Sequence, residues 1–149
     1  MNRFFSLRPV VVVLVATGML MAGTRASAEE RSHKSGGTAQ FVSPTDFVGS
    51  GEATHLGRYA EAGTAQFSPT AVPGVLRVDA RVVLTAANGD QLYETITGRL
   101  DLLTGAITAT VTYVGGTGRF ADAGGSATLS GQMLPDGTIT VSVEGTIDY

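Results

Sequence analysis

The sequence has 149 residues, of which 43% are hydrophobic, and a formal net charge of −3. It contains no cysteine, which excludes disulfide bonds, thiolate nucleophiles and cysteine-ligated metals. The excess of acidic over basic residues argues against nucleic acids and anionic membrane surfaces as partners, because both attract basic proteins.

The first 28 residues have the pattern of a targeting segment. Arg3 and Arg8 give a positive start, residues 10–22 are almost continuously apolar, and Ala26-Ser27-Ala28 is a small-residue cleavage signal. The apolar run is shorter than the roughly 20 residues that span a bilayer. We therefore expect a cleaved signal peptide over residues 1–28 and an exported protein, secreted or periplasmic. An uncleaved N-terminal anchor is the alternative.

Cleavage after residue 28 would leave an acidic chain of 121 residues. It removes three of the 10 basic residues and none of the 13 acidic ones, so the net charge becomes −6. This length suits one domain. We expect residues 29–37 to form a flexible leader, in which His33 is solvated, and residues 38–149 to form a β-barrel domain. The only other histidine is His55, so we expect no metal site.

From residue 38 onward the sequence predicts one strand after another. No stretch keeps the apolar period of 3.6 that is typical of a helix, and Gly, Thr and Val are frequent. Asn88-Gly89 predicts a type I′ hairpin turn, and residues 135–137, Pro-Asp-Gly, predict a second tight turn. The predicted strands are residues 38–42, 51–56, 58–67, 75–86, 91–102, 106–114, 119–131 and 138–148.

Alternation of apolar and polar residues assigns the faces of these strands. In residues 76–84 every even position is apolar, whereas Arg77, Asp79 and Arg81 share the other face. Residues 107–113 and 139–147 alternate in the same way, as expected for an antiparallel sheet with one solvated face. Eight such strands predict a closed barrel or a sandwich. Long neighbouring hairpins and glycine bends favour an all-β fold with an eight-stranded antiparallel β-barrel, whose closure removes exposed edges.

A glycine-rich stretch at residues 113–127 joins two of the predicted strands. Residues 116–121 match the dinucleotide-binding pattern G-x-G-x-x-A, but the two glycines that follow disfavour the helix which that pattern requires, so we expect no cofactor. The stretch instead predicts a tight connection followed by a bulge or bend in the outgoing strand. Phe120 would be a buried plug and Arg119 a rim residue that bonds carbonyl groups. The residues of this structural motif are Gly115, Gly116, Thr117, Gly118, Arg119, Phe120, Gly124 and Gly125.

The same stretch resembles the signature hairpin of plant dirigent proteins and of the wider allene oxide cyclase barrel group, in which Gly-Gly-Thr-Gly-x-Phe precedes an Ala-x-Gly bend. Residues 55–59, His-Leu-Gly-Arg-Tyr, and 88–93, Asn-Gly-Asp-Gln-Leu-Tyr, are similar to small exported bacterial proteins of that group. The resemblance implies an eight-stranded antiparallel barrel with an apolar interior. Dirigent proteins steer the coupling of phenoxy radicals, and allene oxide cyclases close a fatty-acid epoxide. No functional residue of either family carries over to a position of this sequence.

One source of catalytic chemistry remains, a carboxylate in an apolar pocket, where desolvation raises its pKa into the acid–base range. The candidate is Glu94, which shares a strand face with apolar neighbours. If it points inward, Arg58, Arg77 or Tyr113 would pair with it and help to bind a ligand. We favour the alternative, in which the opposite face of the strand lines the interior and Glu94 is solvated, because an unpaired buried charge is costly.

These observations lead us to expect a non-catalytic exported barrel that binds a small apolar or phenolic ligand or serves as a structural module. We expect no nucleic-acid partner and no membrane association of the mature form. One alternative is an isomerase, cyclase-like or dirigent-like, that acts on a lipid or phenolic substrate in the barrel mouth. Another is a surface protein without ligand that forms a dimer or trimer. An open lumen with Glu94 beside an arginine or tyrosine would favour the isomerase.

Overall fold

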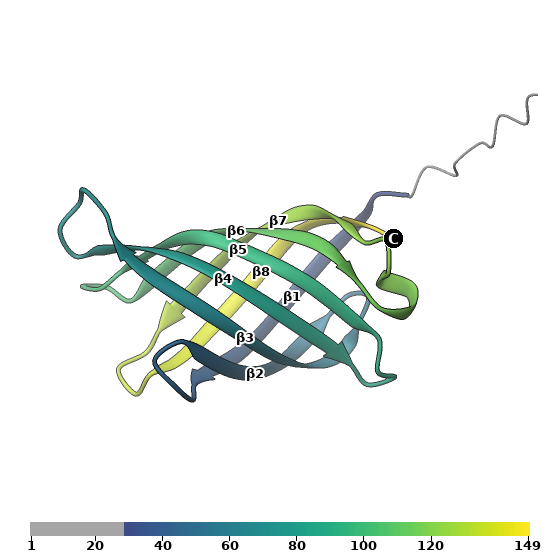
Figure 1. Ribbon diagram of the computed structural model, residues 1–149, viewed down its shortest axis with the longest axis horizontal. Coiled ribbons are helices and arrows are strands. Elements are labelled where there is room, and N and C mark those ends of the chain that lie inside the picture. Colours follow the sequence, from purple (N-terminus) through teal and green to yellow (C-terminus); the bar gives the residue numbers. More distant parts are fainter. Residues whose placement is uncertain (1–28) are drawn as a thin grey trace, which may run out of the picture.

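The structure, a computed structural model, describes residues 29–149, so the expected signal peptide at residues 1–28 lies outside the described residues. The described chain forms eight antiparallel strands that close into one barrel (Figure 1). Each strand pairs with its neighbours in sequence, and β8 pairs with β1. The prediction of a closed, eight-stranded antiparallel barrel is confirmed. The strands are β1 Arg31–Phe41, β2 Asp46–Ala53, β3 Gly57–Pro69, β4 Val75–Ala86, β5 Gln91–Asp101, β6 Ala106–Gly116, β7 Gly124–Met133 and β8 Thr138–Asp148.

Strand β1 begins at Arg31, within the segment expected to be a flexible leader. Residues 31–37 pair with β8 on one side, and from Ser35 onward also with β2 on the other. The leader prediction was wrong because this polar segment has little alternation of its own. Its extended conformation comes from hydrogen bonds to the neighbouring strands. His33, expected to be solvated, is fully buried.

The two ends of the barrel differ. The loops after β1, β3, β5 and β7 lie at one end, which we call the open end; in Figure 1 it is on the left. The turns after β2, β4 and β6 lie with the C-terminus at the other, closed end. There the short 3₁₀ turn η1 (Gly118–Phe120) carries Phe120, which is fully buried with Leu92, Val111 and Ile147. The prediction that Phe120 is a buried plug is confirmed.

Glycines shape the connection from β6 to β7. Gly115 and Gly118 have φ values of 104° and 57°, in the left-handed region that other residues rarely adopt. After η1 the chain continues into β7 at Gly124 rather than into a helix. Arg119 Nε lies 3.5 Å from Asp90 Oδ2, so this arginine pairs with a carboxylate of the β4–β5 turn and not, as expected, with carbonyl groups.

A β-bulge lies on β6, before this connection. Leu92 of β5 pairs with Gly116, and Glu94 pairs with Tyr113, so β6 has one more residue than β5 over this interval. The sequence predicted a bulge or bend at residues 124–125. These residues pair with β8 in continuous register, so no bulge lies there, but Gly125 has a positive φ of 109°. The bulge makes Glu94 and Tyr113 direct cross-strand neighbours.

The turn between β4 and β5 has a different form from the predicted type I′ turn. That turn requires positive φ at both central residues, but only Gly89 has it, with φ 90°. The N–H of Gly89 donates to the carbonyl of Ala86 at 2.9 Å, and the N–H of Ala86 donates to the carbonyl of Asp90 at 2.9 Å. The result is a three-residue loop that ends in a left-handed glycine. Asn88-Gly89 thus predicted the hairpin correctly but its turn type wrongly.

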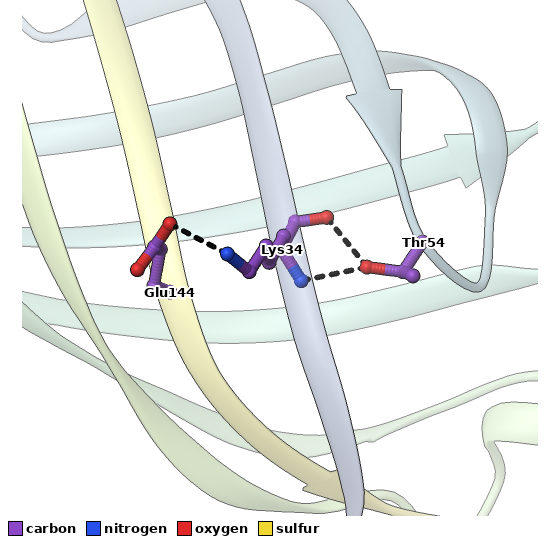
Figure 2. A network of polar contacts seen from close by, with 3 residues as sticks. All are labelled: Lys34, Thr54 and Glu144. Carbon is purple, nitrogen blue, oxygen red and sulfur yellow. Dashed lines mark hydrogen bonds and ion pairs between the residues drawn. The ribbon is translucent and has the colours of Figure 1, made fainter.

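Polar groups cross the outer surface where β1 closes the barrel against β8 (Figure 2). Lys34 Nζ lies 3.1 Å from Glu144 Oε1 of β8. On the other side, the backbone N–H of Lys34 donates to Thr54 Oγ1 at 2.6 Å, and this hydroxyl donates to the Lys34 carbonyl at 2.8 Å. Both charged side chains are 66% exposed, so the ion pair contributes at most about 1 kcal/mol. The continuous backbone pairing of β1 with β8 therefore holds this seam.

Replacing Phe120 with alanine should lower the free energy of unfolding by about 3–5 kcal/mol, because it leaves a hole at a fully buried position. Phe67→Ala is the matched control. It removes the same atoms from a side chain that is 37% exposed at the open end, so it should cost clearly less. Equilibrium urea denaturation of the three proteins measures both losses. Equal losses would contradict the assignment of Phe120 as the plug.

Candidate functional site

The inner faces of the strands enclose a cavity of about 100 Å³ that extends from the middle of the barrel toward its open end. Most of its lining is aliphatic or aromatic. A second hollow, of about 280 Å³, lies at the rim of the open end and shares several side chains with it. The two hollows adjoin, because four side chains line both of them. The shared side chains are Phe41, Phe67, Leu100 and Met133.

Glu94 lines this cavity and is only 7% exposed, so the favoured interpretation of the sequence, a solvated Glu94, was wrong. The two arginines considered as its partners are on the outer surface. Arg58 Nε lies 3.3 Å from Glu52 Oε1. Arg77 donates to both carboxylate oxygens of Asp79, at 2.7 and 3.0 Å. Neither arginine therefore contributes to the interior, and neither is part of the candidate site.

Glu61 is a second acid in the cavity, and sequence reasoning missed it. It lies on β3, where small residues occupy both faces and alternation is weak. Its register partner on β2 is Gly49, and a Cβ atom at Gly49 would collide with Glu61 Oε1. The carboxyl group thus occupies space that any other residue at position 49 would fill. A glycine opposite an acid on the next strand is the signal that could have revealed this residue.

Burial changes the protonation of both acids. It raises the pKa of Glu94 to about 8, with a smaller contribution from the nearby Glu61. It raises the pKa of Glu61 to about 7. Near neutral pH Glu94 is therefore mostly protonated and Glu61 about half protonated, and a neutral carboxyl is far less costly to bury than a carboxylate. A protonated Glu94 carries no charge, so the cost of burying an unpaired charge does not argue against its inward orientation.

Two tyrosines lie close to these acids. The hydroxyl of Tyr59 lies over Gly37 and Gly51, where a Cβ atom would come within 2.9 and 2.5 Å of it. Tyr113 is the cross-strand neighbour of Glu94, and its buried hydroxyl has no hydrogen-bond partner among the described residues. Burial is the main cause that raises the pKa of both tyrosines, and carboxylate neighbours add to it. Both hydroxyls remain protonated at neutral pH and can donate hydrogen bonds.

His33 lies beyond Tyr113, toward the closed end. Its ring centroid is 5.3 Å from that of Tyr113 and 5.7 Å from that of His55. Neither ring nitrogen of His33 has a hydrogen-bond partner within residues 29–149. Burial, and to a lesser degree His55, lower the pKa of His33 to about 4, so the ring is neutral. His55 Nε2 lies 2.8 Å from the carbonyl oxygen of Ser32.

The glycine-rich motif does not line the cavity, because residues 115–120 lie at the closed end. Of the functional candidates from the sequence, the structure brings together Glu94 and Tyr113 and leaves Arg58 and Arg77 outside. Within residues 29–149, no three His, Asp or Glu side chains gather in a way that could hold a metal ion. No helix in that range is long and apolar enough to cross a membrane.

Comparison of the sequence with models of known protein families and with curated proteins finds no match. The closed eight-stranded barrel does not by itself identify the dirigent or allene oxide cyclase group, because one fold hosts many unrelated functions. What the protein does has to be inferred from the cavity and its side chains.

The fold should be less stable at pH 8 than at pH 6.5 because of the two cavity acids. Between these values an unfolded glutamate, with a pKa near 4.5, is ionised, whereas folded Glu94 and Glu61 still bind protons. The folded state thus binds more protons, and the free energy of unfolding falls as pH rises, by about 2 kcal/mol over this window. His33 acts in the opposite sense, but only below its ordinary pKa of 6.5.

Urea denaturation at a series of pH values from 6.5 to 8 measures this slope. Glu94→Gln should remove most of it, and Glu52→Gln, at an exposed position, should leave it unchanged. A slope that is flat in the unmodified protein, or equal in the Glu94→Gln variant, would show that Glu94 is ionised in the folded state.

Proposed function

We propose that the barrel binds a small, largely apolar molecule in its lumen, with a hydrogen-bonding group of the ligand at the two buried carboxyls. The observation that carries this proposal is the apolar cavity that contains Glu61 and Glu94. Mostly apolar walls with a few placed polar groups are typical of small-molecule sites. The cavity of about 100 Å³ is smaller than the engineered cavity of about 150 Å³ that admits benzene. It therefore suits a narrow molecule, or the head of a longer one whose remainder lies at the rim.

The proposal includes export and kinship with the allene oxide cyclase and dirigent-like barrels. Export is supported by the pattern of residues 1–28, and kinship by the Gly-Gly-Thr-Gly-Arg-Phe hairpin together with the eight-stranded barrel. A ligand-free structural or oligomeric role is the weaker alternative, because side chains do not completely fill the interior.

The pairing of Glu94 with Tyr113 favours a second candidate function, an isomerase of the cyclase type. Glu94, protonated at neutral pH, can donate a proton to a substrate oxygen, and Glu61, with the lower pKa, can accept one. Two carboxyl groups whose pKa values lie near neutral pH suit acid and base roles in one reaction. Such an isomerisation requires no redox cofactor.

Native mass spectrometry of the protein purified from the organism that makes it should detect an adduct that denaturation releases. Ala65 is 3% exposed and lines the cavity, so Ala65→Phe directs a ring into the binding space and should abolish the adduct. Ala60→Phe, on the outer face of the same strand, should retain it. Overpacking costs about 1–3 kcal/mol, so thermal unfolding is measured to establish that each variant is folded. An adduct that persists in folded Ala65→Phe would contradict binding in the lumen.

A further inference from the structure

We infer that the polar group of the ligand is a protonated amine. The lumen is a site for an unbranched alkylammonium ion whose nitrogen lies at Glu61 and Glu94 and whose alkyl chain extends toward the open end. This inference rests on the proposed function and names the class of ligand.

The first argument is the uncompensated charge of the cavity. Two carboxyl groups line it, and no lysine or arginine does. Every lysine and arginine within residues 29–149 is exposed. When both carboxyls ionise, no cationic side chain of the lining offsets their charge, so a cation that enters the lumen from outside would stabilise the ionised pair. An ammonium group supplies that charge, and its attraction to a carboxylate is strong where burial lowers the local dielectric.

The second argument is the balance of donors and acceptors. Tyr59 and Tyr113 are protonated and act as donors, and an ionised carboxylate accepts hydrogen bonds at both of its oxygens. An ammonium ion has three donors and no acceptor, so it fits a site whose acceptors are Glu61 and Glu94. The buried hydroxyl of Tyr113, the neighbour of Glu94, has no hydrogen-bond partner among the described residues. An ionised Glu94 would provide an acceptor for it. A carboxylate ligand would instead be repelled by each carboxyl that ionises.

The third argument is the shape of the space beyond the acids. From Glu94 to Leu100, strand β5 runs six residues toward the open end, which is roughly 15 Å along a barrel with tilted strands. The volume of about 100 Å³ makes this space narrow, and an alkyl chain fits it better than a ring does. Apart from Ser35 and Tyr59, the remaining side chains of the lining are apolar. They include Ala39, Ala65, Ala80, Ile107 and Leu129.

Binding of such a cation is coupled to protons. The titratable groups that line the site are Tyr59, Glu61 and Glu94. Tyr113 lies beside Glu94, with neutral His33 behind it. The tyrosines keep their protons throughout the neutral range, so only the carboxyls respond. An alkylamine, like lysine, has a pKa of about 10.4 and stays charged there. Affinity should therefore rise from pH 6 to pH 8 as the carboxyls ionise, and binding at pH 7 should release protons.

Isothermal titration calorimetry with n-hexylamine, hexan-1-ol and hexanoate tests the inference, because the three probes share one chain length and differ in charge. At pH 7.5 hexylamine should bind about tenfold or more tighter than hexan-1-ol, as expected for a charge-assisted hydrogen bond, and hexanoate should be the weakest. Titration in two buffers of different ionisation enthalpy should reveal proton release with hexylamine alone. Benzylamine, which carries a ring, should bind more weakly than hexylamine.

Single substitutions test which residues are responsible for the preference for hexylamine. Glu94→Gln should weaken hexylamine binding about tenfold or more and leave hexan-1-ol nearly unchanged, since the amide keeps the shape and loses the charge. Glu52→Gln, at an exposed position on β2, should change neither affinity. Glu61→Gln provides the same comparison if Glu94→Gln does not fold. Ala65→Phe should abolish the binding of both probes.

The outcomes separate the two proposals. Equal affinity for hexylamine and hexan-1-ol, or unchanged hexylamine binding in folded Glu94→Gln, overturns the amine inference and leaves binding in the lumen intact. Failure of hexylamine, hexan-1-ol and hexanoate to bind overturns both, as does binding that survives in folded Ala65→Phe.

Discussion

The space inside an eight-stranded barrel is only wide enough for the side chains that point into it, so the size of each inward residue decides whether a cavity exists. Three inward positions on β1 and β2 are glycines: Gly37, Gly49 and Gly51. The space left by their missing side chains is occupied by polar groups of β3. The carboxyl of Glu61 lies against Gly49, and the hydroxyl of Tyr59 lies over the other two. The carboxyl of Glu61 and the hydroxyl of Tyr59 can therefore occupy these positions because the three glycines have no side chains.

The closed end determines the electrostatics of the cavity. Aromatic rings contact one another across this end at tilted or edge-on angles, with the Phe120 and Tyr149 centroids 5.0 Å apart and those of Tyr149 and His55 5.5 Å apart. His33 continues the series inward. This layer belongs to the core at the closed end, and the burial of Glu94 leaves its carboxylate form poorly solvated. The same packing that completes the hydrophobic core thus raises the pKa values of both acids, and a cation that enters from the open end would displace their protons.

The sequence predicted the fold well where alternation is strict. Strand β4 has apolar residues at every even position from Leu76 to Leu84, and its bounds and its inner face both agree with the prediction. The start of β1 could not be predicted, because residues 31–37 become a strand only through pairing with β8, more than 100 residues away. Turn positions were evident from Gly and Asn, but turn type depends on backbone angles that these residues permit without specifying.

The candidate site was predicted only in part, for a related reason. The sequence offered Glu94 as an inward residue by its alternation with apolar neighbours, but the cost of a buried charge appeared to exclude it. That cost applies to the ionised form, and the site avoids it by proton binding, which no pattern of residues reveals. Glu61 was missed because β3 has alanine and glycine on both faces, so its alternation carries little information. Arg58 and Arg77 were candidates only because the sequence does not show whether residues of different strands lie on the same face of the barrel.

The pairing of the first strand with the last has a consequence for how the chain assembles. All other strand pairs join neighbours in sequence, so a meandering sheet can grow one hairpin at a time with short loops to close. The final step brings together segments with the greatest separation along the chain, where the entropy lost on loop closure is largest. Until β8 is available, β1 has a free edge and the rings around His33 are uncovered. A chain that ends before β8 would keep two open edges, which are the surfaces that lead β-proteins to associate with one another.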